Sequence, residues 1–374
     1  MTVSSRLNFL LFCVFLLTLS PPAQSEPFGS HSRGPLINGR STNRVTQMVN
    51  YPEPTFEYLA PSKEFTWKDP IPEMKDVPIL RDVYEHRAPK EPGILFVNDK
   101  KVSMMTEDTG TIAHELTHGI HSYLEKDNPD FAGFYVPGRG SLLVQKSLAR
   151  RIDIAKFIPK ELRGIDGGGG RFNTYIQDKH GREPDAGSPF IDGKKQEGAA
   201  NALYPWDEWN SYINGAKAAL QAEKKFGKQN SDYLTGPVEF SIYALGSMMA
   251  TQKHDPKYTQ SDAFKEMKKA YAYFTSESLR VLREGRGTSL GADKAELYLE
   301  RFREGRSAES RAMRDFLVAE FGAEWTANTF GLPVRPVARR EESQRVNISE
   351  AVTESPPTKK FLWFFSWPSR KSNP

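Results

Sequence analysis

The segment from Thr109 to Leu124 constrains the fold most, because it predicts one helix with two chemically different faces. Asp108 or Thr109 is a suitable N-cap for such a helix. At about 100° of rotation per residue, apolar side chains fill one arc, and histidines with a glutamate fill the opposite arc. The apolar arc contains Ile112, Ala113, Leu116, Ile120, Tyr123 and Leu124. We therefore expect a helix that packs in a core on one side and lines a cleft on the other.

The polar arc contains His114, Glu115 and His118 of the sequence His114-Glu115-Leu116-Thr117-His118, a motif that is typical of zinc sites. Residues four apart lie on one side of a helix, so both imidazoles can reach one ion at about 2.0–2.1 Å. Glu115 lies about 100° further round the helix, away from the metal and beside the water that it would deprotonate. The sequence therefore predicts a Zn2+ cofactor held by His114 and His118, with Glu115 as the general base.

His121 extends the polar arc, but it lies about 10.5 Å further along the helix axis than His114. That distance is too long for both side chains to bind one ion, so we expect His121 at the helix surface or hydrogen-bonded to a ligand. The extended motif with a third histidine six residues after His118 is absent, because Leu124 occupies that position. This disfavours the metzincin class.

A catalytic zinc ion needs three protein ligands and an open position for water, so a third ligand must come from elsewhere in the chain. The candidates are Glu208, Glu197 and Glu239. Glu208 is preferred because Trp206 and Trp209 flank it in the first turn of a predicted helix. A carboxylate in such apolar surroundings is costly unless a cation meets it, and a zinc ion would do so. Glu197 and Glu239 stay open as alternatives.

The oxyanion formed during hydrolysis needs a further hydrogen-bond donor, commonly a tyrosine, histidine or arginine. Tyr212 is our candidate, because it follows Glu208 by one helical turn. Tyr243 and His254 are alternatives for the same role. The sequence leaves this choice open.

The first 25 residues have the pattern of a signal peptide. Arg6 is the only charged side chain before an apolar run over 7–19, and Ala23-Gln24-Ser25 offers small residues at the cleavage site. The run is too short to span a bilayer of about 30 Å comfortably. We therefore expect a secreted, periplasmic or cell-envelope protein. The only cysteine, Cys13, would leave with this segment, so the mature chain would bind a metal through histidine and carboxylate.

The rest of the chain divides by composition. Its 374 residues, 38% hydrophobic with a formal net charge of +4, suit one large domain or two smaller ones and do not indicate nucleic-acid binding. We expect an extended Pro-rich arm over 26–75, a catalytic domain over 76–332 and a disordered tail over 333–374. The tail ends in the aromatic cluster Phe361–Trp367 between basic residues, which suits contact with a membrane surface or docking on the protein body.

Periodicity predicts a mainly helical domain. The expected elements are a short strand at 93–97, helices at 109–124, 141–157, 206–227, 237–251, 261–284, 293–304 and 307–322, and a loop-rich stretch at 167–193.

The segment His114–His121, followed by Leu203-Tyr204-x-x-Asp207-Glu208-Trp209-x-x-Tyr212, resembles the gluzincin metallopeptidases. More narrowly, it is similar to a little-characterised group of secreted bacterial zinc peptidases, over roughly residues 90–250. The resemblance implies an α+β, mainly α, zincin-like domain with a small β-sheet over the active-site helix and a helical C-terminal half. It also implies that an edge strand, here 93–97, pairs with extended peptide substrate.

The function that the resemblance implies is a secreted zinc-dependent metallopeptidase. Glu115 would assist the attack of a zinc-bound water on the peptide bond of a peptide or protein substrate. Two alternatives remain open: a catalytically silent, zinc-stabilised binding module of the cell envelope, and a zinc amidase acting on cell-wall peptides. The sequence does not predict the oligomeric state.

Overall fold

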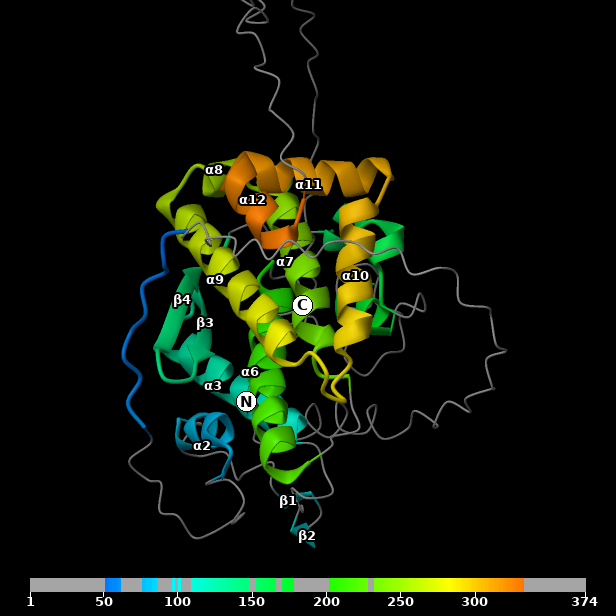
Figure 1. The fold of residues 1–374 in the computed structure, drawn as a ribbon. Coiled ribbons are helices and arrows are strands. Elements are labelled where there is room, and N and C mark those ends of the chain that lie inside the picture. The colour runs from blue at the N-terminus through cyan, green and yellow to red at the C-terminus, as the bar shows by residue number, and fades with distance from the viewer. Residues whose placement is uncertain are drawn as a thin grey trace, which may run out of the picture. The chain divides into compact units, whose positions relative to one another are not determined.

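The computed structural model describes residues 51–61, 76–86, 96–97, 100–101, 109–147, 153–165, 170–177, 202–227 and 232–332 (Figure 1). The predicted signal peptide, the tail after residue 332 and the candidate ligand Glu197 lie outside these residues.

The described part is mainly helical, with two small antiparallel hairpins. The α-helices are α2 (Pro78–Glu85), α3 (Thr109–Asp127), α6 (Tyr204–Phe226), α7 (Thr235–His254), α8 (Pro256–Thr259), α9 (Asp262–Glu284), α10 (Ala292–Glu304), α11 (Ala308–Phe321) and α12 (Ala323–Phe330). Shorter helices of other types are η2 (Ile154–Phe157), η3 (Lys160–Leu162) and η4 (Phe172–Gln177). The hairpins pair β1 (Phe96–Val97) with β2 (Lys100–Lys101), and β3 (Phe131–Val136) with β4 (Gly140–Gln145).

Six of the predicted helices are confirmed, as α3, α6, α7, α9, α10 and α11. Two of them start at serine caps: Ser261 accepts a hydrogen bond from the third amide of α9, and Ser307 does the same for α11. Helices α2, α8 and α12 are additional to the prediction, and η4 lies within the stretch predicted to be loop. No helix in the described ranges is long and apolar enough to cross a bilayer.

The predicted helix over 141–157 is wrong. Its first part is strand β4, and the later residues 154–157 form a short 3-10 helix. Gly138 and Gly140 both adopt positive φ, which lets the chain turn back so that β4 pairs with β3. Leu142 and Val144 then point into the core while Leu143 is partly exposed, the alternation of a strand with one buried face.

The sheet that packs against α3 is the β3–β4 hairpin, through strand β3 (Figure 1). Phe134 of β3 lies edge-on to His121 of α3, with 5.7 Å between the ring centroids. On the edge of β4 that is not paired with β3, Glu57 of the arm forms an antiparallel bridge with Ser141 through backbone hydrogen bonds of 2.7 and 2.8 Å. A small sheet beside the histidine helix is therefore present, but it follows that helix in the chain.

The first two turns of α6 are anchored by two buried tryptophans. Trp206 donates its indole N–H to Ser247 of α7, and Trp209 donates to Ser278 of α9, both at 2.8 Å. Both rings are fully buried, and truncating such a side chain costs about 3–5 kcal/mol. The pair therefore holds the start of α6 rigidly, including the two acidic residues between the tryptophans.

Helices α3 and α6 approach each other closely at a pair of glycines. A Cβ atom on Gly215 of α6 would lie only 2.8 Å from the carbonyl oxygen of Gly110 in α3. It would also lie 3.3 Å from the Cβ of His114. The absence of a side chain at Gly215 therefore lets the polar face of α3 come within side-chain reach of α6.

Candidate metal centre

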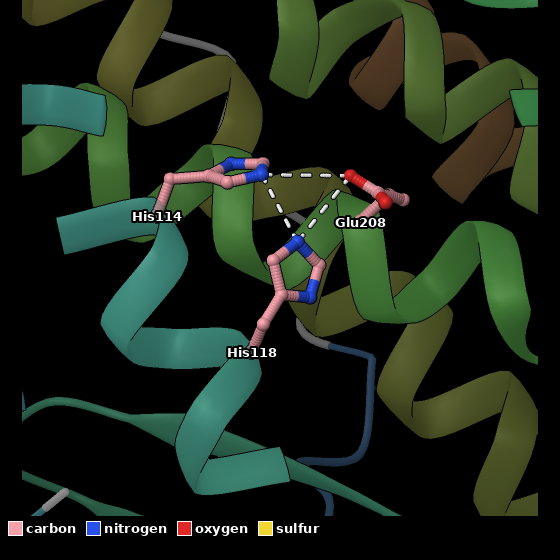
Figure 2. A group of neighbouring side chains, drawn as sticks. All are labelled: His114, His118 and Glu208. Carbon is pink, nitrogen blue, oxygen red and sulfur yellow. Dashed lines mark hydrogen bonds and ion pairs between the residues drawn. The ribbon is translucent and has the colours of Figure 1, made fainter. Parts of the chain in front are cut away.

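Three side chains that could bind a metal ion converge between α3 and α6: His114, His118 and Glu208 (Figure 2). The Nε2 atoms of His114 and His118 lie 3.0 Å apart. One carboxylate oxygen of Glu208 lies 3.5 Å from the first of these atoms and 3.4 Å from the second. Ligands at 2.0–2.1 Å in a tetrahedral zinc site are separated by about 3.3 Å. The three side chains thus form three corners of a site of the right size for zinc.

No family model, curated protein or solved structure was found to match this chain.

The carboxylate of Glu208 has one satisfied and one unsatisfied oxygen. Its Oε1 accepts a hydrogen bond of 3.1 Å from the hydroxyl of Tyr204, whereas its buried Oε2 has no hydrogen-bond partner in the described structure. Burial alone would raise the pKa of Glu208, but the nearby imidazoles of His118 and His114 lower it to about 2. A buried oxygen without a partner is costly. A cation between Oε2 and the two imidazoles would satisfy it, so the residues present fit a zinc ion.

The alternative ligand Glu239 is engaged elsewhere. Its Oε2 lies 2.6 Å from a guanidinium nitrogen of Arg171, and its Oε1 accepts a 2.9 Å bond from the amide of Ile165. Both oxygens are therefore used within the protein. The predicted trio of His114, His118 and Glu208 is the group that the fold brings together, while Glu197 lies outside the described residues.

Asp207 is a site residue that the sequence analysis missed. One of its oxygens lies 2.9 Å from Nδ1 of His118, and the other contacts Nδ1 of His121. Burial opposes ionisation of Asp207, but the charge of His118 holds its pKa far below the ordinary value. Burial would likewise lower the pKa of His118, yet Asp207 and Glu208 raise it well above the ordinary value. A carboxylate behind a ligating imidazole fixes its orientation, and here it leaves Nε2 facing the other two ligands.

His121 is not part of the group formed with Glu208, in agreement with the prediction, but it is not at the surface either. It is only 2% exposed. Its Nε2 lies 2.8 Å from the side-chain oxygen of Asn210, and its Nδ1 faces Asp207. His121 therefore helps to fix the position of Asp207, and Asp207 in turn orients His118.

The isosteric substitution Asp207→Asn is expected to weaken zinc binding about 10–100-fold, because losing the carboxylate behind a ligating imidazole has effects of this size. The measurement is a competition titration against a chromogenic chelator. Asp127→Asn, which removes an exposed carboxylate from the last turn of the same helix, is the control and should bind zinc as the wild type does. Equal affinity of the Asp207 variant and the wild type would contradict a supporting role.

Glu115 and Tyr212 are the residues predicted to act as general base and oxyanion donor. Glu115 is partly exposed and makes no hydrogen bond or ion pair with any described residue, so its carboxylate is available to a water molecule. The ring of Tyr212 meets the ring of His114 nearly at right angles, with 4.4 Å between centroids. The ring of Tyr212 therefore borders His114, and the catalytic roles of Glu115 and Tyr212 stay predictions.

The other two candidates for the oxyanion donor are placed differently. Tyr243 is fully buried, and its hydroxyl lies 3.5 Å from Glu239. His254 is the exposed last residue of α7. Two further residues, Arg171 and Tyr175, lie near Tyr212. No sequence pattern indicated that they belong to the site, because they lie in a stretch predicted to be loop.

Proposed function

We propose that this chain is a zinc-dependent metallopeptidase, a hydrolase that cleaves peptide bonds in peptide or protein substrates. One observation carries the proposal: two imidazoles and a carboxylate converge with spacings suited to zinc, and one buried oxygen among them lacks a hydrogen bond. Three protein ligands of this type, with a fourth position left for water, are typical of catalytic rather than structural zinc sites.

A zinc ion bound by these residues supplies polarisation of the scissile carbonyl and acidification of water. The chain's own residues perform the remaining work. Glu115 accepts a proton from the attacking water and passes it to the leaving amine. Tyr212 donates a hydrogen bond to the oxygen that gains negative charge. Asp207 keeps the ring of His118 in its ligating orientation.

The proposed architecture is a zincin-like domain over 76–332, with α3 and α6 as the two helices that bear the ligands. The β3–β4 hairpin beside α3 supports this proposal, although it follows α3 in the chain. We also propose a secreted, periplasmic or envelope location, supported by the pattern of residues 1–25. Contact of Phe361–Trp367 with a membrane surface belongs to the same proposal.

Removal of the metal is expected to abolish hydrolysis of fluorescently labelled casein, and added zinc should restore it. The measurement is the initial rate before and after dialysis against 1,10-phenanthroline, with zinc content recorded in parallel. Hydrolysis that continues in the metal-free protein would contradict the proposal. A protein that binds one zinc ion but cleaves no peptide would instead be a silent binding module. Cleavage of cell-wall peptides alone would identify a zinc amidase.

A further inference from the structure

The two oxygens of the Glu208 carboxylate face different partners. Both contacts with the histidines end on Oε2, which lies 3.5 Å from Nε2 of His114 and 3.4 Å from Nε2 of His118 (Figure 2). Oε1 instead accepts a hydrogen bond of 3.1 Å from the hydroxyl of Tyr204. The residue is only 5% exposed, so the carboxylate is largely shielded from water. The surroundings thus distinguish two atoms that are equivalent in a free carboxylate.

Tyr204 is held in place as a donor to Oε1. It is the first residue of α6, and Glu208 follows four residues later, so both side chains lie on one side of the helix. The indole hydrogen bonds of Trp206 and Trp209 fix this part of α6 against α7 and α9. An ionised carboxylate is an acceptor only, so the phenol is the donor in this bond.

The number of carboxylate oxygens that bind the metal decides whether a position for water remains. His114, His118 and Oε2 of Glu208 supply three donor atoms, and a catalytic zinc site needs a fourth position that stays open. A carboxylate can bind a metal ion through one oxygen or through both. If both oxygens of Glu208 bound, the protein would supply four donor atoms, the number found in closed structural sites. Water would then compete for a crowded position.

We propose that Tyr204 is a positioning residue: its hydrogen bond retains Oε1, limits Glu208 to one metal-binding oxygen and so keeps a coordination position open. The inference deepens the proposed function and rests on its metal site. It gives Tyr204 a different role from Asp207, which orients the ring of His118. Loss of Asp207 should weaken metal binding, whereas loss of the Tyr204 hydroxyl should change the coordination of the metal without weakening its binding.

The test replaces zinc with Co2+, whose visible absorption spectrum depends on the number and geometry of its ligands. The wild-type protein is compared with Tyr204→Phe, which keeps the ring and removes only the hydroxyl. Both proteins should bind about one Co2+ ion with similar affinity. The absorption bands of the variant should differ from those of the wild type in position and intensity, because a second oxygen of Glu208 enters the coordination shell.

Thiocyanate is the probe of the open position, because this small anion binds Co2+ there and changes its spectrum. Thiocyanate should bind Tyr204→Phe about tenfold more weakly than the wild type, at the lower end of the effects of residues behind a metal ligand. In the zinc-loaded proteins, kcat for a labelled peptide should fall by a similar factor. Tyr123→Phe, which removes the hydroxyl of an exposed ring on α3, is the matched control and should behave as the wild type in every measurement.

The outcomes separate this inference from the function on which it rests. A wild-type spectrum or a wild-type thiocyanate affinity in Tyr204→Phe would overturn the role of Tyr204 and leave the peptidase proposal intact. A loss of Co2+ affinity of about 10–100-fold without a spectral change would do the same, because that is the effect of a residue that only orients a ligand. A wild-type protein that binds no Co2+ and no zinc would remove both proposals. If the wild type binds metal but hydrolyses no peptide, the peptidase function fails, and the spectra still decide the role of Tyr204.

Discussion

Replacing Glu115 with Gln is expected to lower the rate of peptide hydrolysis about 10²–10⁴-fold, the range for loss of a positioned general base. Glutamine has nearly the same size, but its amide cannot accept the proton from water. Zinc content should not change, because Glu115 is not among the three converging ligands. The measurements are initial rates on labelled casein together with metal analysis of the purified variant.

The control for this prediction is Asp127→Asn, which removes a carboxylate from the exposed end of the same helix. It should hydrolyse casein at the wild-type rate. If the Glu115 variant kept full activity with full zinc content, another group would have to accept the proton, and the proposed mechanism would be wrong.

Replacing Glu208 with Ala is expected to reduce bound zinc from about one ion per chain to a small fraction of that value. Two imidazoles would remain, one ligand short of the three that catalytic zinc sites use. Activity should be lost together with the metal. Circular dichroism should show a folded protein, because α6 is anchored by Trp206 and Trp209 rather than by the carboxylate between them. The measurement is metal analysis after dialysis against a weak chelator.

Two substitutions serve as comparisons for the Glu208 variant. Glu239→Gln should keep its zinc, because both oxygens of Glu239 are occupied by Arg171 and Ile165. Glu197→Ala tests the remaining alternative from the sequence. If the Glu197 variant lost its zinc and the Glu208 variant kept it, the third ligand would be Glu197 and not Glu208.

Helices could be predicted from the sequence where their caps and apolar periodicity depend only on neighbouring residues. α9 carries a serine cap and a one-sided apolar stripe, so its length follows from neighbouring residues alone. The β3–β4 hairpin was not recognised, because the run after Gly140 contains apolar residues at spacings that also suit a helix. Its strand conformation depends on the turn at Gly138 and on pairing with β3. Periodicity in a short apolar run does not separate these two outcomes.

By itself, the sequence determined that His114, Glu115 and His118 lie on one helix face, because the geometry of a single turn requires only those residues. It also offered Glu208 as the third ligand, but as one of three candidates. Only the tertiary structure chose among them within the described residues, because the choice depends on how α6 and α7 pack. The close approach at Gly215 brings Glu208 to the histidines, whereas α7 turns Glu239 toward Arg171. Asp207 acquires its role in the same way, since its partner His118 lies 89 positions away in the chain.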